Sequence, residues 1–546
     1  MFIAKKHLII FLFLVVGIAT IYQFLMDIGS GFCYLDMCYP KIYNFEKMVF
    51  LNVQTKPTAL LRQPMDAIIN IMASLTAGYS NNILFLIIFA LGSFWFYKNF
   101  DSNEKIGTAA VFGAILVFNP FIYSRIMMGQ WGVAFSVITM PIFVYYLFEY
   151  FKSPTNRNII FAVASFMLSS SFQFHFFVIN SGMAFLYFLL NLYNEKFDKK
   201  PVKCISSFAK LIAILFLVNL YWIIPSIYLY ATNQNTIFEA IDESHLSFFS
   251  PKESQTGNTL FISLAMYGAW RENGIILARD IIPTPIFLLT LFVIVYLTIT
   301  GFVANPKNIE NIFLLIVGVA GLFLATGVSH PWTSEFFKWS FNNIPFFSGF
   351  RDSNKFLGLL VVSYALLGTR GLKEILKNQP FFIKCIIVTA VLSSLIIYNY
   401  PQIGLSNQLH PLKFPKCYNE LNNYLNKLPS NKNIIYLPWN EYMNYNWSMA
   451  AGIDGKISTP INALVDKYII TGTYFMDFSV LAGFPNKISA CINTQDTDCM
   501  KKLGVNYVIY DKTNLLPKND SKFDYSWINK LNATYNNDCT TVFKVG

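Results

Sequence analysis

Three charged side chains stand where a loop turns into an apolar helix, in the stretch NIPFFSGFRDSNKFLGLL at residues 343–360. They are Arg351, Asp352 and Lys355. Arginine and lysine bind phosphate oxygens through charge-assisted hydrogen bonds, and a carboxylate accepts a proton or orients a cation. The three residues form either part of an active site or an ordinary membrane boundary, depending on which polar residues share their side of the membrane.

Other polar residues stand beside apolar runs, where ionisable groups are costly and therefore candidates for function. When an acceptor hydroxyl displaces a phosphate leaving group, a carboxylate takes the proton of the hydroxyl and cations neutralise the departing phosphate. We therefore expect Arg351, Lys355 and Arg125 to contact the phosphate of a lipid-linked donor. The supporting candidates are His175, Gln130 and Asp352, and Asp36 and Asp27 are the outer-face carboxylates that follow the first apolar run.

Each candidate also has a structural interpretation. Asp27 can be a helix-end charge in water, and Asp36 can be held in a small disulfide loop. Arg125 can anchor a span at the interface, and His175 can be hydrogen-bonded packing. Asp352 is expected to cap the helix or to orient Arg351 rather than to act as the base.

The composition identifies a polytopic membrane protein. Hydrophobic residues make up 54% of the 546 residues and charged residues 13%, against about 25% charged in soluble domains. Apolar runs of spanning length recur and predict about eleven transmembrane helices. The predicted spans are 7–26, 82–98, 106–124, 131–151, 158–173, 176–193, 207–230, 281–304, 311–328, 356–369 and 381–399. The first follows MFIAKK without a small-residue cleavage site, which predicts a retained signal-anchor.

The basic residues of the short loops predict the orientation, because cytoplasmic loops are enriched in lysine and arginine. With a cytoplasmic N-terminus, the inside loops hold 14 basic residues, whereas the outside turns at 125–130 and 173–176 hold only Arg125. An odd number of spans then places the C-terminal region outside. All the candidate site residues fall on the outer face.

The cysteines agree with this orientation. Of the eight, Cys204 falls in an inside loop and Cys385 in a span. The other six all fall in outside segments, where an oxidising compartment would allow disulfides: Cys33, Cys38, Cys417, Cys491, Cys499 and Cys539. Their spacing does not determine the pairing, although Cys33–Cys38 and Cys491–Cys499 are close in sequence.

Two domains are predicted. Residues 1–400 form the transmembrane domain, with long outer loops at 27–80, 231–280 and 329–354. Residues 401–546 are long enough for a separate domain, in which NIIYLPW, VNYVIY and TTVFKV resemble strands and YNELNNYLNKL resembles an amphipathic helix. The fold class is therefore an α-helical polytopic membrane protein with a C-terminal extracytoplasmic α/β domain.

Several function classes are excluded. The net charge of +11 is explained by basic cytoplasmic loops, and no basic cluster interleaved with aromatics indicates nucleic-acid binding. The sequence has no P-loop or GxGxxG pattern and no Cys/His spacing for zinc. No cofactor is predicted; a divalent metal is possible but nothing in the sequence indicates one.

Four stretches resemble the GT-C superfamily of membrane glycosyltransferases, close to archaeal and bacterial members related to arabinofuranosyltransferases and other enzymes that use polyprenyl-phosphate sugars. They are FNPFIYSRIMMGQWGVAFSVITMPIF, NLYWIIPS, FFSGFRDSNKFLGLLVVSYALLGTRGL and KKLGVNYVIYDK. The resemblance covers nearly the whole chain. It implies a polyprenyl-phosphate sugar donor and a lipid, glycan or glycoprotein acceptor.

The resemblance also implies a catalytic carboxylate in the first outer loop, which points to Asp36 or Asp27. Asp36 is preferred because LDMCYP resembles the acidic segment before a proline in related sequences. The chain lacks the paired acidic residues of that segment and the WWDYG signature of oligosaccharyltransferases. The base assignment therefore stays open, and protein N-glycosylation is not expected.

We therefore hypothesise a multi-pass glycosyltransferase of the cell membrane, with a cytoplasmic N-terminus and an extracytoplasmic C-terminal domain. The first alternative is a transporter or flippase of a lipid-linked glycan, which deep charges and inverted repeats would favour. The second is a non-catalytic membrane scaffold whose outer domain binds glycan.

Overall fold

A computed structural model gives the fold of the chain. The structure describes residues 18, 32–34, 37–39, 61–62, 64–65, 67–68, 105–197, 201–231, 243–253, 257–344, 347–409, 412–429, 431–440, 442–450, 457–467, 469–472, 484–515 and 525–545. The chain divides into two compact units. Unit 1 comprises Met1–Tyr22, Asn82–Tyr221 and Glu243–Ser406, and unit 2 comprises Gln23–Asn81, Trp222–Asp242 and Asn407–Gly546. The boundary predicted between residues 400 and 401 stays a prediction.

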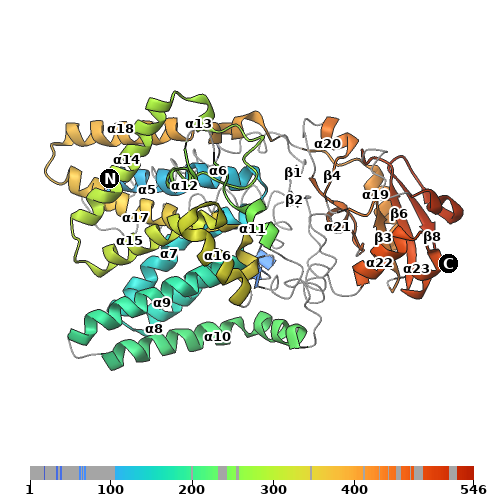
Figure 1. The fold of residues 1–546 in the computed structure, drawn as a ribbon, viewed down its shortest axis with the longest axis horizontal. Coiled ribbons are helices and arrows are strands. Elements are labelled where there is room, and N and C mark those ends of the chain that lie inside the picture. The colour runs from blue at the N-terminus through green and yellow to red at the C-terminus, as the bar shows by residue number, and fades with distance from the viewer. Residues whose placement is uncertain are drawn as a thin grey trace. The chain divides into compact units, whose positions relative to one another are not determined.

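Unit 1 is a helical bundle (Figure 1). Its helices are α5 (Lys105–Val117), α6 (Pro120–Met127), α7 (Trp131–Lys152), α8 (Asn156–Ser170), α9 (Phe174–Phe197), α10 (Pro201–Ala231, which continues into unit 2), α11 (Glu243–Phe249), α12 (Thr259–Leu264), α13 (Ala278–Ile281), α14 (Thr284–Val303), α15 (Ile309–Ala325), α16 (Pro331–Asn343), α17 (Leu357–Leu376) and α18 (Phe381–Tyr398). Short 3₁₀ helices are η3 (Gly327–Ser329), η4 (Phe347–Arg351), η5 (Ser353–Phe356) and η6 (Tyr400–Asn407).

Six helices among the described residues are long and apolar enough to cross a membrane, or seven if the bent pair α5–α6 is one span. They cover Trp131–Lys152, Phe174–Asn194, Pro201–Tyr228, Thr284–Val303, Ser353–Leu376 and Phe381–Tyr398. The predicted count of eleven is therefore not confirmed. The predicted spans 7–26 and 82–98 lie outside the described residues, apart from residue 18. Helices α8 and α15 occupy the predicted spans 158–173 and 311–328 but contain only 15 and 17 residues.

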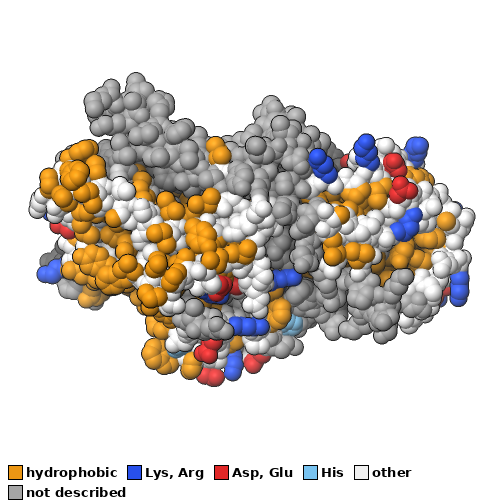
Figure 2. Space-filling view, turned by 90° about the horizontal axis from the view of Figure 1, so that it is seen from above, with side chains coloured by type: hydrophobic (Ala, Val, Ile, Leu, Met, Phe, Trp, Pro, Cys, Tyr) orange, Lys and Arg blue, Asp and Glu red, His pale blue; other side chains and the backbone are white. Residues whose placement is uncertain are grey.

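The outward surface of unit 1 suits a lipid environment. Isoleucine, leucine and phenylalanine side chains of α10, α14 and α18 are exposed, including Leu217, Leu289 and Phe382. Hydrophobic side chains gather on the left part of the face drawn in Figure 2, with few charges among them. The chain is a multi-pass membrane protein.

Helix α17 is the central helix of the bundle and is buried along almost its whole length. It meets α14 at backbone contact: a Cβ atom built on Gly301 would lie 1.9 Å from the Leu367 carbonyl oxygen. A Cβ atom on Gly371 would lie 1.9 Å from the Leu297 carbonyl oxygen. Small residues permit such close crossings in membrane proteins.

Gly371→Ala is therefore expected to destabilise the protein by about 1–3 kcal/mol, because the added methyl group forces two helix backbones apart. Thermal unfolding in detergent measures this loss. Gly182→Ala is the control, since a Cβ atom there meets nothing within 4 Å. Equal melting temperatures for the two variants would contradict the close crossing.

Ion pairs and hydrogen bonds tie the two ends of the bundle. At one end Glu310 pairs with Lys152 and with Arg370, each at 2.6 Å, which joins the end of α7, the start of α15 and the end of α17. At the other end the Ser353 hydroxyl donates to the Ala325 carbonyl at 2.9 Å. Because α7 has 22 residues and a helix rises about 1.5 Å per residue, the ends lie about 33 Å apart. The sequence grouped Lys152 and Arg370 on one side, and the structure groups them too; which end faces the cytoplasm stays a prediction.

Unit 2 contains a four-stranded sheet in the order β3-β6-β8-β7. The strands are β3 (Asn433–Leu437), β6 (Val505–Asp511), β7 (Asn532–Asn536) and β8 (Thr540–Lys544), with β3 parallel to β6 and the other pairs antiparallel. The remaining elements are β1 (Phe32–Tyr34), β2 (Met37–Tyr39), β4 (Tyr442–Met443), β5 (Ile457–Ser458), α19 (Cys417–Asn426), α20 (Asn446–Ala450), α21 (Ile461–Leu464), α22 (Phe484–Asn493), α23 (Thr497–Lys502) and η7 (Ser526–Lys530). The predicted strands and the predicted helix of this region are confirmed, whereas β7 was not predicted.

Alternation along β3 builds two cores, because successive strand residues face opposite sides. Ile434 and Tyr436 pack with α19, whereas Ile435 and Leu437 pack with α22 and α23. Helices therefore cover both faces of the sheet, and the fold of this unit is α/β.

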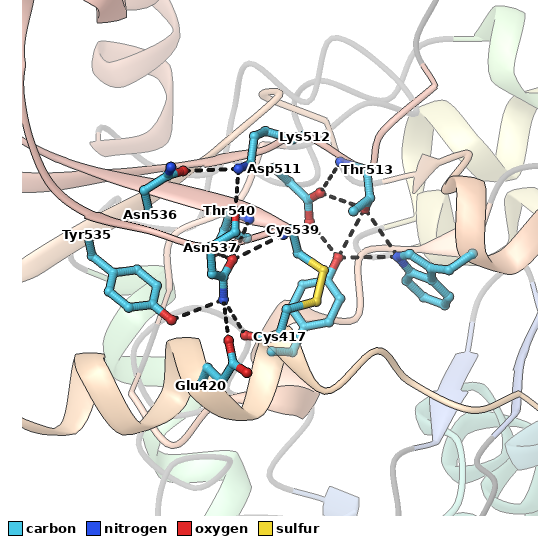
Figure 3. Close-up of a disulfide and its surroundings, with 12 residues drawn as sticks. Cys417, Glu420, Asp511, Lys512, Thr513, Tyr535, Asn536, Asn537, Cys539 and Thr540 are labelled. Atoms are coloured by element: carbon cyan, nitrogen blue, oxygen red, sulfur yellow. Dashed lines mark hydrogen bonds between the residues drawn. A yellow bond between two sulfur atoms is a disulfide. The ribbon is translucent and has the colours of Figure 1, made fainter.

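Two disulfides cross-link the described part of unit 2. Cys417 at the start of α19 bonds Cys539, 122 residues away, and Cys491 bonds Cys499. Figure 3 shows the first beside the Asn537 side chain, which donates to the Cys417 carbonyl at 2.8 Å. The Cys491–Cys499 pairing is thus confirmed. Cys33 and Cys38 are register partners of β1 and β2, and their pairing stays a prediction.

Candidate functional site

A broken span places the first site residue. α5 and α6 form one apolar segment bent by 44°, where the sequence had predicted the single span 106–124. Asn119 causes the break: its side-chain oxygen accepts from the Ile122 amide at 3.0 Å, and its amide donates to the Ile115 carbonyl at 2.9 Å. Pro120 begins α6 and cannot continue the hydrogen bonds of α5. The break sets α6, with Arg125 in its last turn, inside the bundle.

Arg125 is completely buried and forms a bidentate ion pair. Its two terminal nitrogens lie 2.8 and 3.3 Å from the Asp352 carboxylate oxygens, and the same guanidinium donates to Asn354 at 2.6 Å. It also donates to the Gln130 side chain in the turn between α6 and α7. Such two-point pairing fixes the direction of both side chains.

Lys355 lies on the other side of the same carboxylate. Its ammonium is 3.6 Å from Asp352 and 3.4 Å from the Nε2 atom of His175. The Lys355 side chain is 10% exposed and that of Asp352 5%. A cation therefore stands at the edge of a pair that is otherwise sealed from water.

His175 connects this cluster to the loop that precedes Arg351. Its Nε2 atom is 2.6 Å from the Gly349 carbonyl and its Nδ1 atom is 3.2 Å from the Gln173 amide nitrogen. A neutral imidazole with its proton on Nε2 satisfies both partners, since the carbonyl only accepts. The ring also packs edge-on against Phe350, with centroids 5.2 Å apart. These contacts make His175 a positioning residue for the loop.

The Arg351 side chain contacts an aromatic ring and not the Asp352 carboxylate that Arg125 and Lys355 contact. Its guanidinium carbon lies 5.2 Å from the centre of the Phe249 ring, in a cation–π contact, and the residue is half-buried. Such a contact orients the guanidinium group. Arg351 thus adds a half-buried cation next to the buried Lys355.

Among the residues that the structure describes, the cluster carries three cations, Arg125, Arg351 and Lys355, and one carboxylate, Asp352. Burial raises the pKa of Asp352, but Arg125 and Lys355 lower it more, and the pKa falls to about 2. Asp352 is therefore ionised at neutral pH and neutralises only part of the positive charge. An excess of partly buried positive charge favours an anion such as a phosphate group.

Because the pKa of Asp352 is lowered by folding, the stability it contributes is present above pH 4 and is lost as the pH falls to about 2. We expect the difference in melting temperature between the wild type and Asp352→Asn to be constant from about pH 7 to about pH 4 and to shrink below that. Thermal unfolding across this range measures it. A difference that already shrinks between pH 7 and 5 would contradict the strong pairing with Arg125.

The structure brings together Arg125, Gln130, His175, Asp352 and Lys355 from three separate parts of the sequence, with Arg351 beside them. Asp352 occupies the N-cap position of η5 but its side chain makes no capping hydrogen bond there. The capping alternative is therefore wrong, and the alternative that Asp352 orients Arg351 stays a prediction. Asp27 and Asp36 lie outside the described residues, and their catalytic roles stay predictions.

Sequence reasoning missed Asn354, which accepts from Arg125 and donates to the Tyr267 carbonyl at 3.3 Å. The signal was present, because an asparagine inside the polar run Arg351–Lys355 at the start of a span has to find buried partners. Gln173, which holds His175, likewise follows an apolar span. Within the described part of the chain, no group of three or more His, Cys, Asp or Glu residues is arranged to hold a metal ion.

The fold resembles that of solved membrane enzymes. The structure of arabinofuranosyltransferase AftD from Mycobacteria matches with a TM-score of 0.60 and 11% identity over 99% of this chain. A substituted form of the same enzyme matches with a TM-score of 0.58 and 12% identity. This chain spans 40% and 41% of the length of those chains. No family model and no curated protein matches the sequence. The resemblance predicted from the sequence is thus confirmed at the level of the fold, which this chain shares with the arabinofuranosyltransferase structures.

Proposed function

We propose that the chain is an integral membrane glycosyltransferase. It transfers a sugar from a polyprenyl-phosphate-linked donor to a lipid, glycan or protein acceptor on the outer face. The observation that carries the proposal is the pair of cations, the half-buried Arg351 and the buried Lys355, next to the buried Arg125–Asp352 ion pair at one end of the bundle.

The donor phosphate lies against Lys355 and Arg351. The polyprenyl chain occupies lipid beside the spans, and the phosphate sits at the membrane boundary, where these two residues precede α17. Because Asp352 is already held by two guanidinium nitrogens, Lys355 can turn from Asp352 to a phosphate without leaving a buried carboxylate unpaired. The donor contact first predicted for Arg125 is less direct, since its guanidinium is committed to Asp352 and Asn354.

In the reaction the acceptor hydroxyl oxygen attacks the anomeric carbon of the sugar. The bond between that carbon and the phosphate oxygen breaks, and polyprenyl phosphate leaves with the negative charge that Lys355 and Arg351 stabilise. The hydroxyl proton passes to a carboxylate. The resemblance assigns that carboxylate to Asp36, with Asp27 as the alternative.

Two variants test the assignment of the base. Asp36→Asn and Asp27→Asn are purified and assayed with a sugar-labelled polyprenyl-phosphate donor. We expect one variant to lose sugar transfer and the other to retain it. Normal folding is checked by melting temperature. Full activity in both variants would overturn the assignment of the base.

A transporter of a lipid-linked glycan is the second candidate. The broken span α5–α6 favours it, because discontinuous helices form substrate sites in many transporters. In contrast to a transferase, a transporter would move the donor across the membrane intact.

A further inference from the structure

Helix α16, which follows α15 and precedes the site loop, carries three parallel stripes of side chains. The buried stripe consists of Thr333, Phe337 and Ser340. The polar stripe consists of Glu335, Lys338 and Asn342. Between them runs an exposed aromatic stripe of Trp332, Phe336 and Trp339, with exposures of 75%, 50% and 56%. Each stripe repeats at three- and four-residue spacing, as one face of a helix does. We call the third set the aromatic stripe.

The orientation of α16 is fixed by its buried side. Phe337 packs against Phe347 and Phe356, with ring centroids 5.2 and 6.4 Å away. The Thr333 hydroxyl donates to the Gly327 carbonyl at 2.8 Å. The aromatic stripe is therefore displayed by an anchored helix and is not the result of fraying.

The aromatic stripe continues the lipid-facing surface of α15. Ile316 and Val319 are 38% and 45% exposed on that apolar helix, and Phe323 follows on the same face. Phe323 stacks on Trp332 with centroids 6.2 Å apart. An unbroken apolar strip therefore runs from the flank of the bundle onto α16.

We propose that α16 lies in the interface of the bilayer. Its aromatic stripe is inserted at the boundary between headgroups and acyl chains, and its polar stripe faces water. Bilayer lipid is the occupant because the stripe is continuous with the exposed apolar face of α15, which belongs to a bundle of membrane-spanning helices. Tryptophan is enriched at that depth, and helices with one apolar and one charged face lie along it.

This placement sets the depth of the candidate site. From Phe337 a chain of rings passes through Phe347 to Phe350, whose centroids are 5.8 Å apart, and Phe350 contacts His175. Arg351 follows directly in sequence. The interfacial position of α16 thus holds the cations of the site at headgroup level.

Fluorescence quenching by brominated lipids tests the proposal without an activity assay. The full chain is reconstituted in phosphatidylcholine vesicles whose acyl chains carry bromine either near the headgroup or near the chain end. The double variant Trp332→Phe/Trp339→Phe removes two indoles and keeps the stripe aromatic, so its difference from the wild type isolates their signal. We expect this difference signal to be quenched strongly by shallow bromine and weakly by deep bromine.

The control is Trp527→Phe, which removes a tryptophan that is 1% exposed and whose signal neither lipid should quench. A difference signal quenched by iodide in water but by neither lipid would overturn the proposal, as would a signal shielded from all three. Added polyprenyl phosphate should leave the lipid quenching unchanged. A donor-dependent loss of quenching would assign the stripe to the isoprenoid chain and would also overturn it.

Discussion

Replacing Arg125 by leucine is expected to destabilise the protein by about 3–5 kcal/mol, because it removes one partner of a buried ion pair and leaves the Asp352 carboxylate with weaker compensation. Arg125 is 0% exposed and contacts both carboxylate oxygens. Chemical denaturation of the purified protein, followed by intrinsic fluorescence, measures the loss. Transfer activity should fall with it, because Asp352 and Asn354 lose the group that orients them.

An exposed ion pair of the same unit is the matched control. Lys338 and Glu335 lie 3.5 Å apart, with side chains 42% and 87% exposed. Lys338→Ala should change the free energy of unfolding by at most about 1 kcal/mol, since solvent screens such pairs. If Arg125→Leu were as stable as Lys338→Ala, the buried pair would not organise the site.

Replacing Lys355 by methionine is expected to lower kcat/KM for the lipid-linked donor by about 100- to 1,000-fold, the usual effect of removing one group that stabilises developing negative charge. The fold should tolerate the change, because Asp352 keeps its two contacts to Arg125 and methionine matches the length and flexibility of the lysine stem. Steady-state transfer with a labelled donor measures the rate, and the melting temperature checks the fold.

Lys355→Arg is the control that keeps the charge, and it should recover part of the activity. Rates within a few-fold of the wild type for Lys355→Met would remove this residue from phosphate binding. A loss of transfer rate accompanied by a clear drop in melting temperature would instead identify Lys355 as a structural partner of Asp352.

The residues of the candidate site were predictable from the sequence, whereas their pairings were not. Ionisable groups at the ends of apolar runs identified Arg125, His175, Asp352 and Lys355 one by one. Arg125 and Asp352, however, are 227 positions apart, and only the packing of α6 against α17 decides that they meet. The predicted capping role of Asp352 is wrong for this reason, because its carboxylate pairs with Arg125 and makes no local capping hydrogen bond.

The break between α5 and α6 had a signal in the sequence. Asn119-Pro120 stands inside an otherwise apolar run, and both residues favour a new helix start. Hydropathy alone averages over such a pair and predicts one span. Polar dipeptides inside predicted spans therefore indicate where a functional half-helix begins.

In unit 2 the apolar strands were predictable and the polar one was not. β3, β6 and β8 bury most of their residues, whereas in β7 four of the five residues are exposed. A strand at the edge of the sheet needs no apolar pattern, because only one neighbour supplies its hydrogen bonds. Pairing with β8, not composition, makes Asn532–Asn536 a strand.

The fate of the donor distinguishes the proposed transferase from a transporter most directly. The purified protein is reconstituted in vesicles that contain a polyprenyl-phosphate donor with a labelled sugar, and both free polyprenyl phosphate and donor position are followed. We predict release of polyprenyl phosphate in step with sugar transfer, and loss of both in Lys355→Met. Intact donor that appears in the opposite leaflet without any release of polyprenyl phosphate would contradict the proposed function.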